Sequence, residues 1–256
     1  MLKARSIYFI LIVLLFAALV VNIFIGLSFW VFVVLIIAIL SLLAYGSSNI
    51  QADFFTKSFH TPAHNQNEIA LTFDDGPTEF TEEILDILKK YNAKATFFCI
   101  GKHIDKNESV LKRMHNEGHS IGNHTYSHSN FFPFFKIKRM REELVKTSQR
   151  ISEITGTKVT LFRPPFGVLN TTIVRAATAE NLKIIGWNLR SYDGGKTDTK
   201  KVLQRIIPNI KKGTVVLLHD TRPDSTTILR KVLEEIKAQN LNTVTVNQIF
   251  DIHEVD

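Results

Sequence analysis

Two adjacent carboxylates, Asp74 and Asp75, follow an apolar, β-branched segment that predicts a buried strand over 69–73. Neighbouring carboxylates repel each other, and burying them without partners is costly, so we expect a metal ion or an arginine opposite them. The alternative interpretation is a helix N-cap, because Gly76 and Pro77 form a predicted turn before an acidic helix start. Other residues of the chain must decide between the two.

Two histidines, His124 and His128, follow a predicted strand over 120–123. A spacing of four can place both rings on one face of a helical turn and direct two nitrogens to one metal ion. The spacing is common by chance. Together with the carboxylates of Asp74 and Asp75, however, it supplies a ligand set with open coordination positions, which is typical of a catalytic divalent ion.

A cation and a third histidine follow later predicted strands. Arg163 comes before two prolines that fix the backbone, so we expect it to point toward the carboxylate pair, although a surface arginine in a loop would give the same pattern. His219 ends an apolar strand. A histidine in that position is more often a core residue than a catalyst, unless a carboxylate lies beside it. Asp193, which follows the preceding strand, could be that carboxylate.

Strand-like and helix-like segments alternate along the C-terminal three quarters of the chain. Strands are predicted over 69–73, 95–100, 120–123, 159–162, 184–189, 214–219 and 242–246, and helices over 81–91, 105–117, 136–155, 170–181, 198–211 and 225–240. The alternation predicts a parallel α/β fold, either a barrel or a doubly wound sheet. In both, the carboxyl ends of the strands, and therefore the polar residues described above, meet at one edge.

The N-terminal region is uncharged over residues 7–45 and consists mostly of Leu, Ile, Val, Phe and Ala. Because one membrane span needs about 20 residues, this segment is long enough for two, and it is too long for a cleaved signal peptide. We predict an integral anchor over 1–45 that contacts the lipid bilayer through 7–45. Its helices are expected at 7–25 and 29–45, with the turn marked by Asn22, Gly26 and Ser28.

A polar linker is expected over 46–67, followed by a catalytic domain over 68–256. Lys3 and Arg5 precede the first span, so the positive-inside rule places the N-terminus in the cytoplasm, and two spans return the domain to the same side. The net charge of +7 is diffuse and no nucleic-acid motif accompanies it, so a nucleic-acid partner is not expected.

Four ordered motifs resemble those of the polysaccharide deacetylases, the NodB-homology domain of carbohydrate esterase family four. They are Thr72–Gly76, His124–His128, Arg163–Gly167 and Leu217–Asp220. The resemblance covers about residues 65–250. It implies a distorted (β/α) barrel and hydrolytic removal of acetyl groups from N-acetylated sugars of a cell-envelope glycan, such as peptidoglycan- or chitin-like N-acetylglucosamine. It also implies an extracytoplasmic domain, which opposes the charge bias.

The same resemblance assigns the metal site and the base. Asp74 matches the general base, and Arg163 matches the arginine that orients it. Asp75, His124 and His128 match the ligands of a divalent metal, with zinc expected first and cobalt, nickel or manganese as alternatives.

Four further positions follow from the resemblance. The backbone N–H of Phe166 matches the oxyanion donor, at a position that the family usually fills with Tyr. Leu217 matches a wall of the acetyl pocket, His219 the general acid, and Asp193 the residue that tunes it. The sequence departs from the family at Gly194, where Trp is usual, so an aromatic wall of the sugar groove is expected to be missing.

A phenylalanine-rich segment, Phe131–Phe135, directly follows the predicted ligand His128. It could cap the core. It could also form an exposed lip that dips into a bilayer, because a group of basic residues follows at Lys136, Lys138, Arg139 and Arg141. The anchor, this segment and Gly194 favour an alternative function, a deacylase of a lipid-linked sugar. A further alternative is an inactive sugar-binding module.

Overall fold

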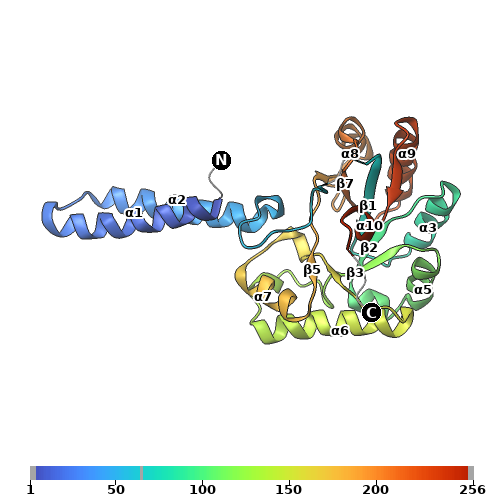
Figure 1. The fold of residues 1–256 in the computed structure, drawn as a ribbon, viewed down its shortest axis with the longest axis horizontal. Coiled ribbons are helices and arrows are strands. Elements are labelled where there is room, and N and C mark those ends of the chain that lie inside the picture. The colour runs from blue at the N-terminus through green and yellow to red at the C-terminus, as the bar shows by residue number, and fades with distance from the viewer. Residues whose placement is uncertain (1–3, 64–65, 253–256) are drawn as a thin grey trace.

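The uncharged N-terminal segment forms two helices, α1 (Ala4–Ile25) and α2 (Phe29–Ser48), which lie side by side and project from an α/β domain (Figure 1). The computed structural model describes residues 4–63 and 66–252. Asn22 closes the turn between the helices by accepting the N–H of Leu27 at 2.7 Å, and Gly26 adopts a positive φ of 62°. The predicted hairpin is therefore confirmed.

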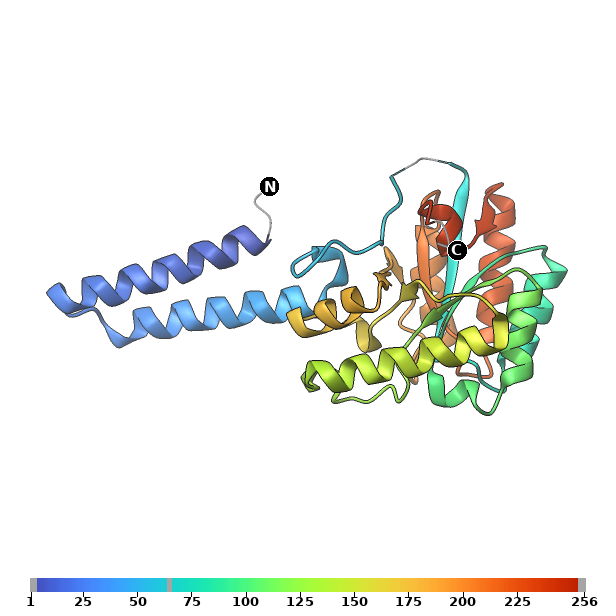
Figure 2. The ribbon, with the colours of Figure 1, turned by 60° about the horizontal axis from the view of Figure 1, so that its bottom comes forward.

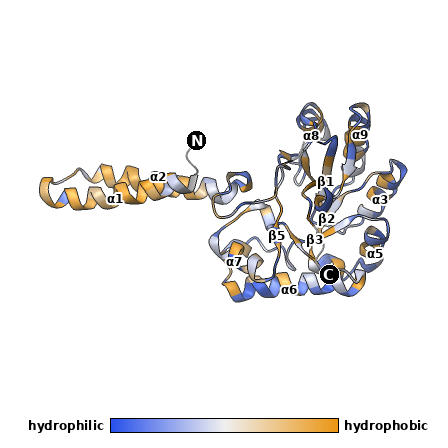
Figure 3. Ribbon diagram, viewed as in Figure 1, coloured by the Kyte–Doolittle hydropathy of each residue, from blue (hydrophilic) through white to orange (hydrophobic). Residues whose placement is uncertain are grey.

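Both hairpin helices are long and apolar enough to cross a membrane, with mean hydropathies of 2.9 for 6–25 and 2.6 for 29–48. None of the residues in the first span is buried, and in the second only Ile39 and Gly46 are. Figure 3 shows the apolar residues running along both helices, in contrast to the mixed surface of the domain. Exposed apolar helices of this length fit a bilayer better than water.

The domain is built on a parallel sheet in the order β5-β4-β3-β2-β1-β7-β6, with β8 paired to β1. Its strands are β1 (Glu68–Asp74), β2 (Thr96–Cys99), β3 (Ser120–Asn123), β4 (Leu161–Phe162), β5 (Lys183–Ile184), β6 (Leu189–Arg190), β7 (Val215–His219) and β8 (Asn242–Val244). The sheet curves into a half-barrel with open edges at β5 and β6, which confirms the predicted distorted barrel of the NodB type.

Helices surround the outside of the sheet (Figure 2). They are α3 (Thr81–Lys90), α4 (Gly101–Ile104), α5 (Glu108–Asn116), α6 (Ile137–Thr155), α7 (Thr171–Ala179), α8 (Thr199–Ile206), α9 (Ser225–Ala238) and α10 (Val246–Ile249), with short 3₁₀ turns at Ile50–Ala52, Phe132–Phe134, Pro165–Gly167 and Ile207–Asn209. The helix predicted over 105–117 instead divides into α4 and α5. The one predicted over 198–211 ends in a 3₁₀ turn that contains Pro208, whose ring has no N–H to continue the helix.

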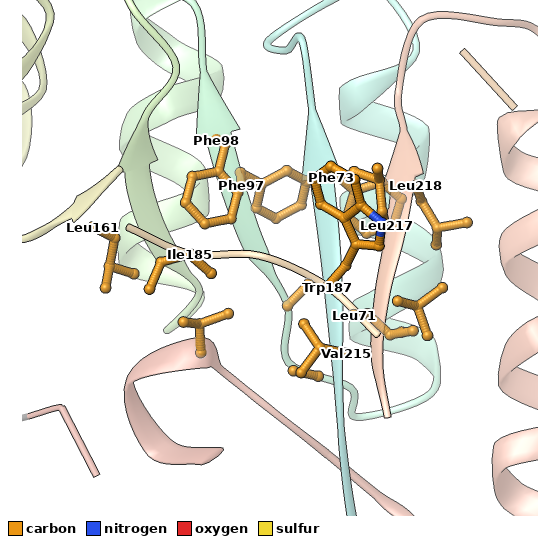
Figure 4. Packing of buried hydrophobic residues seen from close by; sticks show 14 of the residues in the cluster. Leu71, Phe73, Phe97, Phe98, Leu161, Ile185, Trp187, Val215, Leu217 and Leu218 are labelled. Carbon is orange, nitrogen blue, oxygen red and sulfur yellow. The ribbon is translucent and has the colours of Figure 1, made fainter. Parts of the chain in front are cut away.

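The single strand predicted over 184–189 is wrong. The segment forms two short strands at opposite edges of the sheet: β5 pairs with β4, and β6 pairs with β7. The chain between them crosses the half-barrel, and its Ile185 and Trp187 join the buried cluster that includes Phe73 and Phe97 (Figure 4). An apolar run is equally consistent with one strand or two, because hydrophobicity does not reveal the pairing partner.

The segment expected to be a polar linker packs against the domain over much of its length. Ile50 and Phe54 are buried, and the N–H of Phe59 donates to the carbonyl of Ile184 at 2.9 Å. At the end of α2, Ser47 and Leu169 exchange two hydrogen bonds: Leu169 N–H donates to the Ser47 carbonyl at 2.9 Å, and Ser47 Oγ donates to the Leu169 carbonyl at 2.5 Å. The hairpin is thus fixed to the domain at its base.

Candidate active site

Parallel pairing brings the carboxyl ends of four strands to one edge of the sheet. The register places Asp74 at the end of β1 beside His219 at the end of β7. On the other side, Asn123 of β3 pairs with Phe162 of β4, so the residues after these strands lie close together as well. The structure therefore gathers the predicted site residues in one place.

Arg163 is completely buried and lies against Asp74. Its Nη1 donates to Oδ1 of Asp74 at 2.8 Å and to Oγ1 of Thr72 at 2.7 Å. Its Nη2 donates to the carbonyl of Gly186 at 2.8 Å, on the segment that crosses the half-barrel. These partners fix the guanidinium group, and it in turn holds one oxygen of Asp74 in place.

The carboxylate of Asp75 faces two imidazole rings. Its Oδ1 lies 3.3 Å from Nε2 of His124 and 3.2 Å from Nε2 of His128, and the three candidate ligand atoms lie within 4.8 Å of one another. The Nδ1 of His124 lies 2.7 Å from the carbonyl of Arg163. If Nδ1 carries the proton donated to that carbonyl, the Nε2 lone pair is directed at the cluster, as metal-bound histidines require.

This cluster fits a divalent ion. Among the described residues, Oδ1 of Asp75 is buried without a hydrogen-bond partner, which is costly unless another group satisfies it. Burial alone would raise the pKa of Asp75, but the close contact and charge of His124 and the charges of His128 and His219 hold it well below its usual value. Burial, together with His124, lowers the pKa of His128 to about 4, which leaves a neutral ring. An anionic carboxylate and neutral imidazoles are the forms that bind metals. Burial would lower the pKa of His124, but Asp74 and Asp75 raise it, so this ring would give up its proton when a cation binds.

His219, which is half-buried, pairs with the buried Asp193. Nδ1 of His219 lies 2.7 Å from Oδ1 of Asp193, whose Oδ2 also accepts the backbone N–H of His219 at 3.0 Å. Burial would lower the pKa of His219, but the hydrogen bond and charge of Asp193, with smaller contributions from Asp74 and Asp75, raise it to about 9. Its Nε2 lies 4.0 Å from Oδ2 of Asp75. The protonated ring therefore faces the candidate metal cluster.

A cavity of about 380 Å³ connects these groups, and Phe166 and Leu217 line it as well. Phe166 lies in a tight turn with φ of 60°, and its ring packs edge-on against that of His128. Gly167 and Val168 donate their N–H groups to the carbonyls of Pro164 and Pro165. The N–H of Phe166 has no acceptor among the described residues, so it is available to a bound ligand.

An aromatic residue that the sequence did not identify also lines the cavity. Tyr192 is 54% exposed, and the guanidinium groups of Arg190 and Arg205 lie 4.7 and 4.9 Å from its ring centre. The missing aromatic wall at Gly194 stays a prediction, but Tyr192, two residues away, places an aromatic ring beside the same cavity. No sequence pattern singled it out, although a tyrosine beside Asp193 was a signal that could have been used.

Gly194 approaches the ring of His219 closely. A Cβ atom at this position would lie 3.0 Å from Cε1 and 3.1 Å from Nε2 of that ring. A side chain here would require the ring or the loop to shift, so the backbone of Gly194 forms a close-fitting cover over His219.

A parallel half-barrel with a carboxylate–histidine–histidine cluster at its carboxyl edge defines an α/β class of protein with a candidate divalent-metal centre. The family described as polysaccharide deacetylase matches residues 61–185. A peptidoglycan-N-acetylglucosamine deacetylase of Bacillus cereus is 35% identical over 192 residues, which cover 73% of this chain and 70% of that protein. The chain belongs to the polysaccharide deacetylase family, as its four motifs predicted.

Solved structures agree with this assignment. A peptidoglycan N-acetylglucosamine deacetylase in complex with 4-naphthalen-1-yl-N-oxidanyl-benzamide superimposes with a TM-score of 0.72 at 33% identity, covering 78% of this chain and 95% of that one. A CE4 family pseudoenzyme from Bacillus anthracis superimposes with a TM-score of 0.70 at 28% identity, covering 80% and 73%. The fold is therefore shared by proteins with and without activity, and the site residues must decide between them.

Proposed function

We propose that this chain is a metal-dependent hydrolase that removes N-acetyl groups from N-acetylglucosamine units of a cell-envelope glycan. The observation that carries the proposal is the buried, unpartnered Oδ1 of Asp75 between two histidine Nε2 atoms, with Asp74 and His219 on either side. The presence of all these groups around one cavity argues against an inactive sugar-binding module.

A divalent ion held by Asp75, His124 and His128 would supply Lewis-acid chemistry, polarising an amide carbonyl and making a water molecule more acidic. We assign this ion as zinc, with cobalt, nickel or manganese as alternatives, because two imidazoles and one carboxylate are typical zinc ligands.

The chain's own residues carry the protons. Asp74, oriented by Arg163, accepts the proton of the attacking water as its oxygen bonds to the acetyl carbon. The free N–H of Phe166 donates to the oxygen that becomes negatively charged. His219, kept protonated by Asp193, then donates a proton to the sugar nitrogen as the carbon–nitrogen bond breaks. The products are acetate and a free amino sugar.

The acetyl methyl group requires an apolar surface beside this oxygen. Leu217 is buried on β7, two residues before His219, and it lines the same cavity. We propose that it forms the wall against which the methyl group packs. The bulk of the cavity, with Tyr192 at its exposed side, remains for the sugar ring.

The test is acetate release by the purified full chain from chitooligosaccharides, peptidoglycan and lipid-linked N-acetylated amino sugars. Release is measured before chelation, after chelation and after Zn²⁺ is added back. Turnover that chelation abolishes and Zn²⁺ restores is expected from the wild type, and Asp75→Asn serves as the matched negative control. Absence of release from all three substrates would contradict the proposal.

A lipid-linked sugar is the alternative substrate, and the fixed base of the hairpin favours it, because a domain held close to a bilayer meets lipid-linked molecules first. We propose that the hairpin spans the cell membrane and that the domain faces the envelope side. The hairpin places the N-terminal end of α1 and the domain on the same side (Figure 1). Protease accessibility in intact spheroplasts tests the orientation. A fully protected domain would overturn the envelope side and point to a cytoplasmic, lipid-linked precursor.

A further inference from the structure

Four large hydrophobic side chains are exposed in the described part of the chain after Ser48, and all four are aromatic. They are Phe131, Phe134, Phe166 and Tyr192. Two of them, Phe166 and Tyr192, line the cavity, so the proposed reaction accounts for them. Phe131 and Phe134 do not line it, yet they are 71% and 83% exposed. Two exposed rings on one turn form an apolar patch, and such patches mark interaction sites more often than single exposed side chains do.

The turn that carries them, which we call the phenylalanine lip (Phe131–Phe135), is firmly held. Phe132 is fully buried, Phe135 packs against the core, and their rings meet edge-on. Hydrogen bonds from Phe134 N–H to the Phe131 carbonyl and from Phe135 N–H to the Phe132 carbonyl close the turn. The segment thus caps the core with two of its rings and presents the other two outward, which combines both interpretations drawn from the sequence.

The lip lies on the side of the domain from which the hairpin projects. The side-chain amide of Asn170 donates to the carbonyl of Pro133 at 2.7 Å, and the neighbouring Leu169 pairs with Ser47 at the end of α2. Figure 1 and Figure 2 show the start of α6, which directly follows the lip, pointing toward the hairpin. A short chain of contacts therefore connects the lip to the point where α2 meets the domain.

Basic side chains flank the lip without acidic partners. Lys136, Lys138 and Arg139 are exposed, and within 4–63 and 66–252 none of the three forms an ion pair. The guanidinium of Arg139 lies over the ring of Phe135, 3.6 Å from its centre. Apolar rings beside unpaired cations are the combination that suits an anionic lipid surface, where rings enter the acyl boundary and cations meet phosphates.

We propose that the phenylalanine lip docks on the surface of the bilayer that the hairpin enters, with Phe131 and Phe134 inserted and the three basic residues against lipid phosphates. This inference rests on the proposed membrane-spanning role of α1 and α2. It also deepens the proposed function, because Phe131 is three residues beyond the candidate ligand His128. The cavity then opens close to the headgroups, and its substrate class is an N-acetylated amino sugar carried by a membrane lipid.

The docking is tested on the full chain in nanodiscs that contain anionic phospholipid. Cys99 is fully buried and does not compete for a label, so Phe134→Cys can carry one nitrobenzoxadiazole group. The matched control is Lys89→Cys, an exposed position on α3 at the far side of the domain (Figure 1). Insertion into the bilayer should shift the emission of the label at 134 to the blue, and lipids with a doxyl group on the acyl chain should quench it. The label at 89 should show neither effect.

Two results would overturn the docking. Equal, weak quenching at both positions would show that the lip stays in water. A blue shift at 134 without doxyl quenching would show that protein, such as a second copy of the chain, covers the lip instead of lipid.

A second arm separates this inference from the proposed reaction. The double variant Phe131→Ser/Phe134→Ser should keep wild-type turnover of soluble chitooligosaccharide. Its turnover of a lipid-linked N-acetylated amino sugar in the same nanodiscs should fall severalfold. An unchanged rate on the lipid-linked substrate would contradict the docking alone. Failure of the wild type on both substrates would contradict the reaction, whatever the label at 134 reports.

Discussion

Nη1 of Arg163 donates a hydrogen bond of 2.8 Å to Oδ1 of Asp74, and both side chains are buried. The adjacent carboxylate, Asp75, turns instead toward His124 and His128. The two neighbouring carboxylates thus have different partners, an arginine for one and a pair of imidazoles for the other, and their removal should have different effects.

Asp74→Asn should leave metal binding intact and lower kcat by roughly 10²- to 10⁴-fold, because an amide keeps the size and hydrogen bonding of the side chain but cannot accept a proton. Metal content by mass spectrometry, measured beside kcat, checks this. Loss of the metal, or a rate close to that of the wild type, would show that Asp74 is not the base.

Asp75→Asn should lower metal affinity, because it removes the only anionic group of the cluster. A chelator should remove the metal from the wild type only at a concentration higher than the variant requires. Titration of the apoprotein with Zn²⁺ measures both affinities. Equal affinities would remove Asp75 from the ligand set.

Arg163→Met should destabilise the domain by about 3–5 kcal/mol, since it leaves Asp74 buried beside an apolar side chain. The double variant Arg163→Met/Asp74→Asn should recover part of this loss because the uncompensated charge is gone. Denaturant unfolding of the purified chain gives both values. Equal stability of the single variant and the wild type would mean that Asp74 is neutral in the folded protein.

Asp193→Asn should move the alkaline limb of the kcat/KM profile to lower pH. His219 acts as an acid, so activity falls as pH rises through its pKa, which is raised to about 9 chiefly by Asp193 against the opposing effect of burial. Removing the charge lets burial lower the pKa. A divalent ion bound near Asp75 would lower the pKa of His219, because like charges repel. The alkaline limb of the wild type should therefore lie at or below pH 9. Asp86→Asn, an exposed change on α3, is the control and should not move it.

Gly194→Ala should lower kcat while metal content stays constant, because a methyl group would press on the ring of His219 at about 3 Å. Gly195→Ala is the matched control, since a Cβ there meets nothing within 4 Å. Similar rates for the two variants would mean that the loop yields without displacing His219.

Much of the site region could be predicted because its residues follow strand ends, and parallel strands bring those ends together. The family and the half-barrel were correctly predicted because the four ordered motifs resemble those of the polysaccharide deacetylases. The break between β5 and β6 could not be predicted, because Ile184, Ile185, Trp187 and Leu189 are apolar whichever neighbour their strand pairs with. Tyr192 was missed because no motif or apolar pattern singled it out, although it follows a strand end beside Asp193 and lines the cavity.

The segment after the hairpin shows a different limit of sequence reasoning. Its polar composition suggested a linker, yet Ile50 and Phe54 are buried. The segment also begins directly after α2, with the turn Ile50–Ala52. Two or three apolar side chains among polar ones are enough to hold a segment down when their burial exceeds the cost of ordering it.

The two hydrogen bonds between Ser47 and Leu169 limit the distance from the hairpin at which the cavity can meet a substrate. A tether would let the catalytic cavity sweep through the thickness of a cell wall. Here the end of α2 is joined directly to the domain. Gly46 also lies so close to Phe54 that a Cβ atom at Gly46 would be 2.4 Å from the ring. These contacts hold the cavity at a constant distance from the hairpin. With α1 and α2 in a bilayer, the protein would sample a thin layer parallel to the membrane. Its turnover in the cell would then be governed by encounters in two dimensions, through the lateral diffusion of enzyme and substrate.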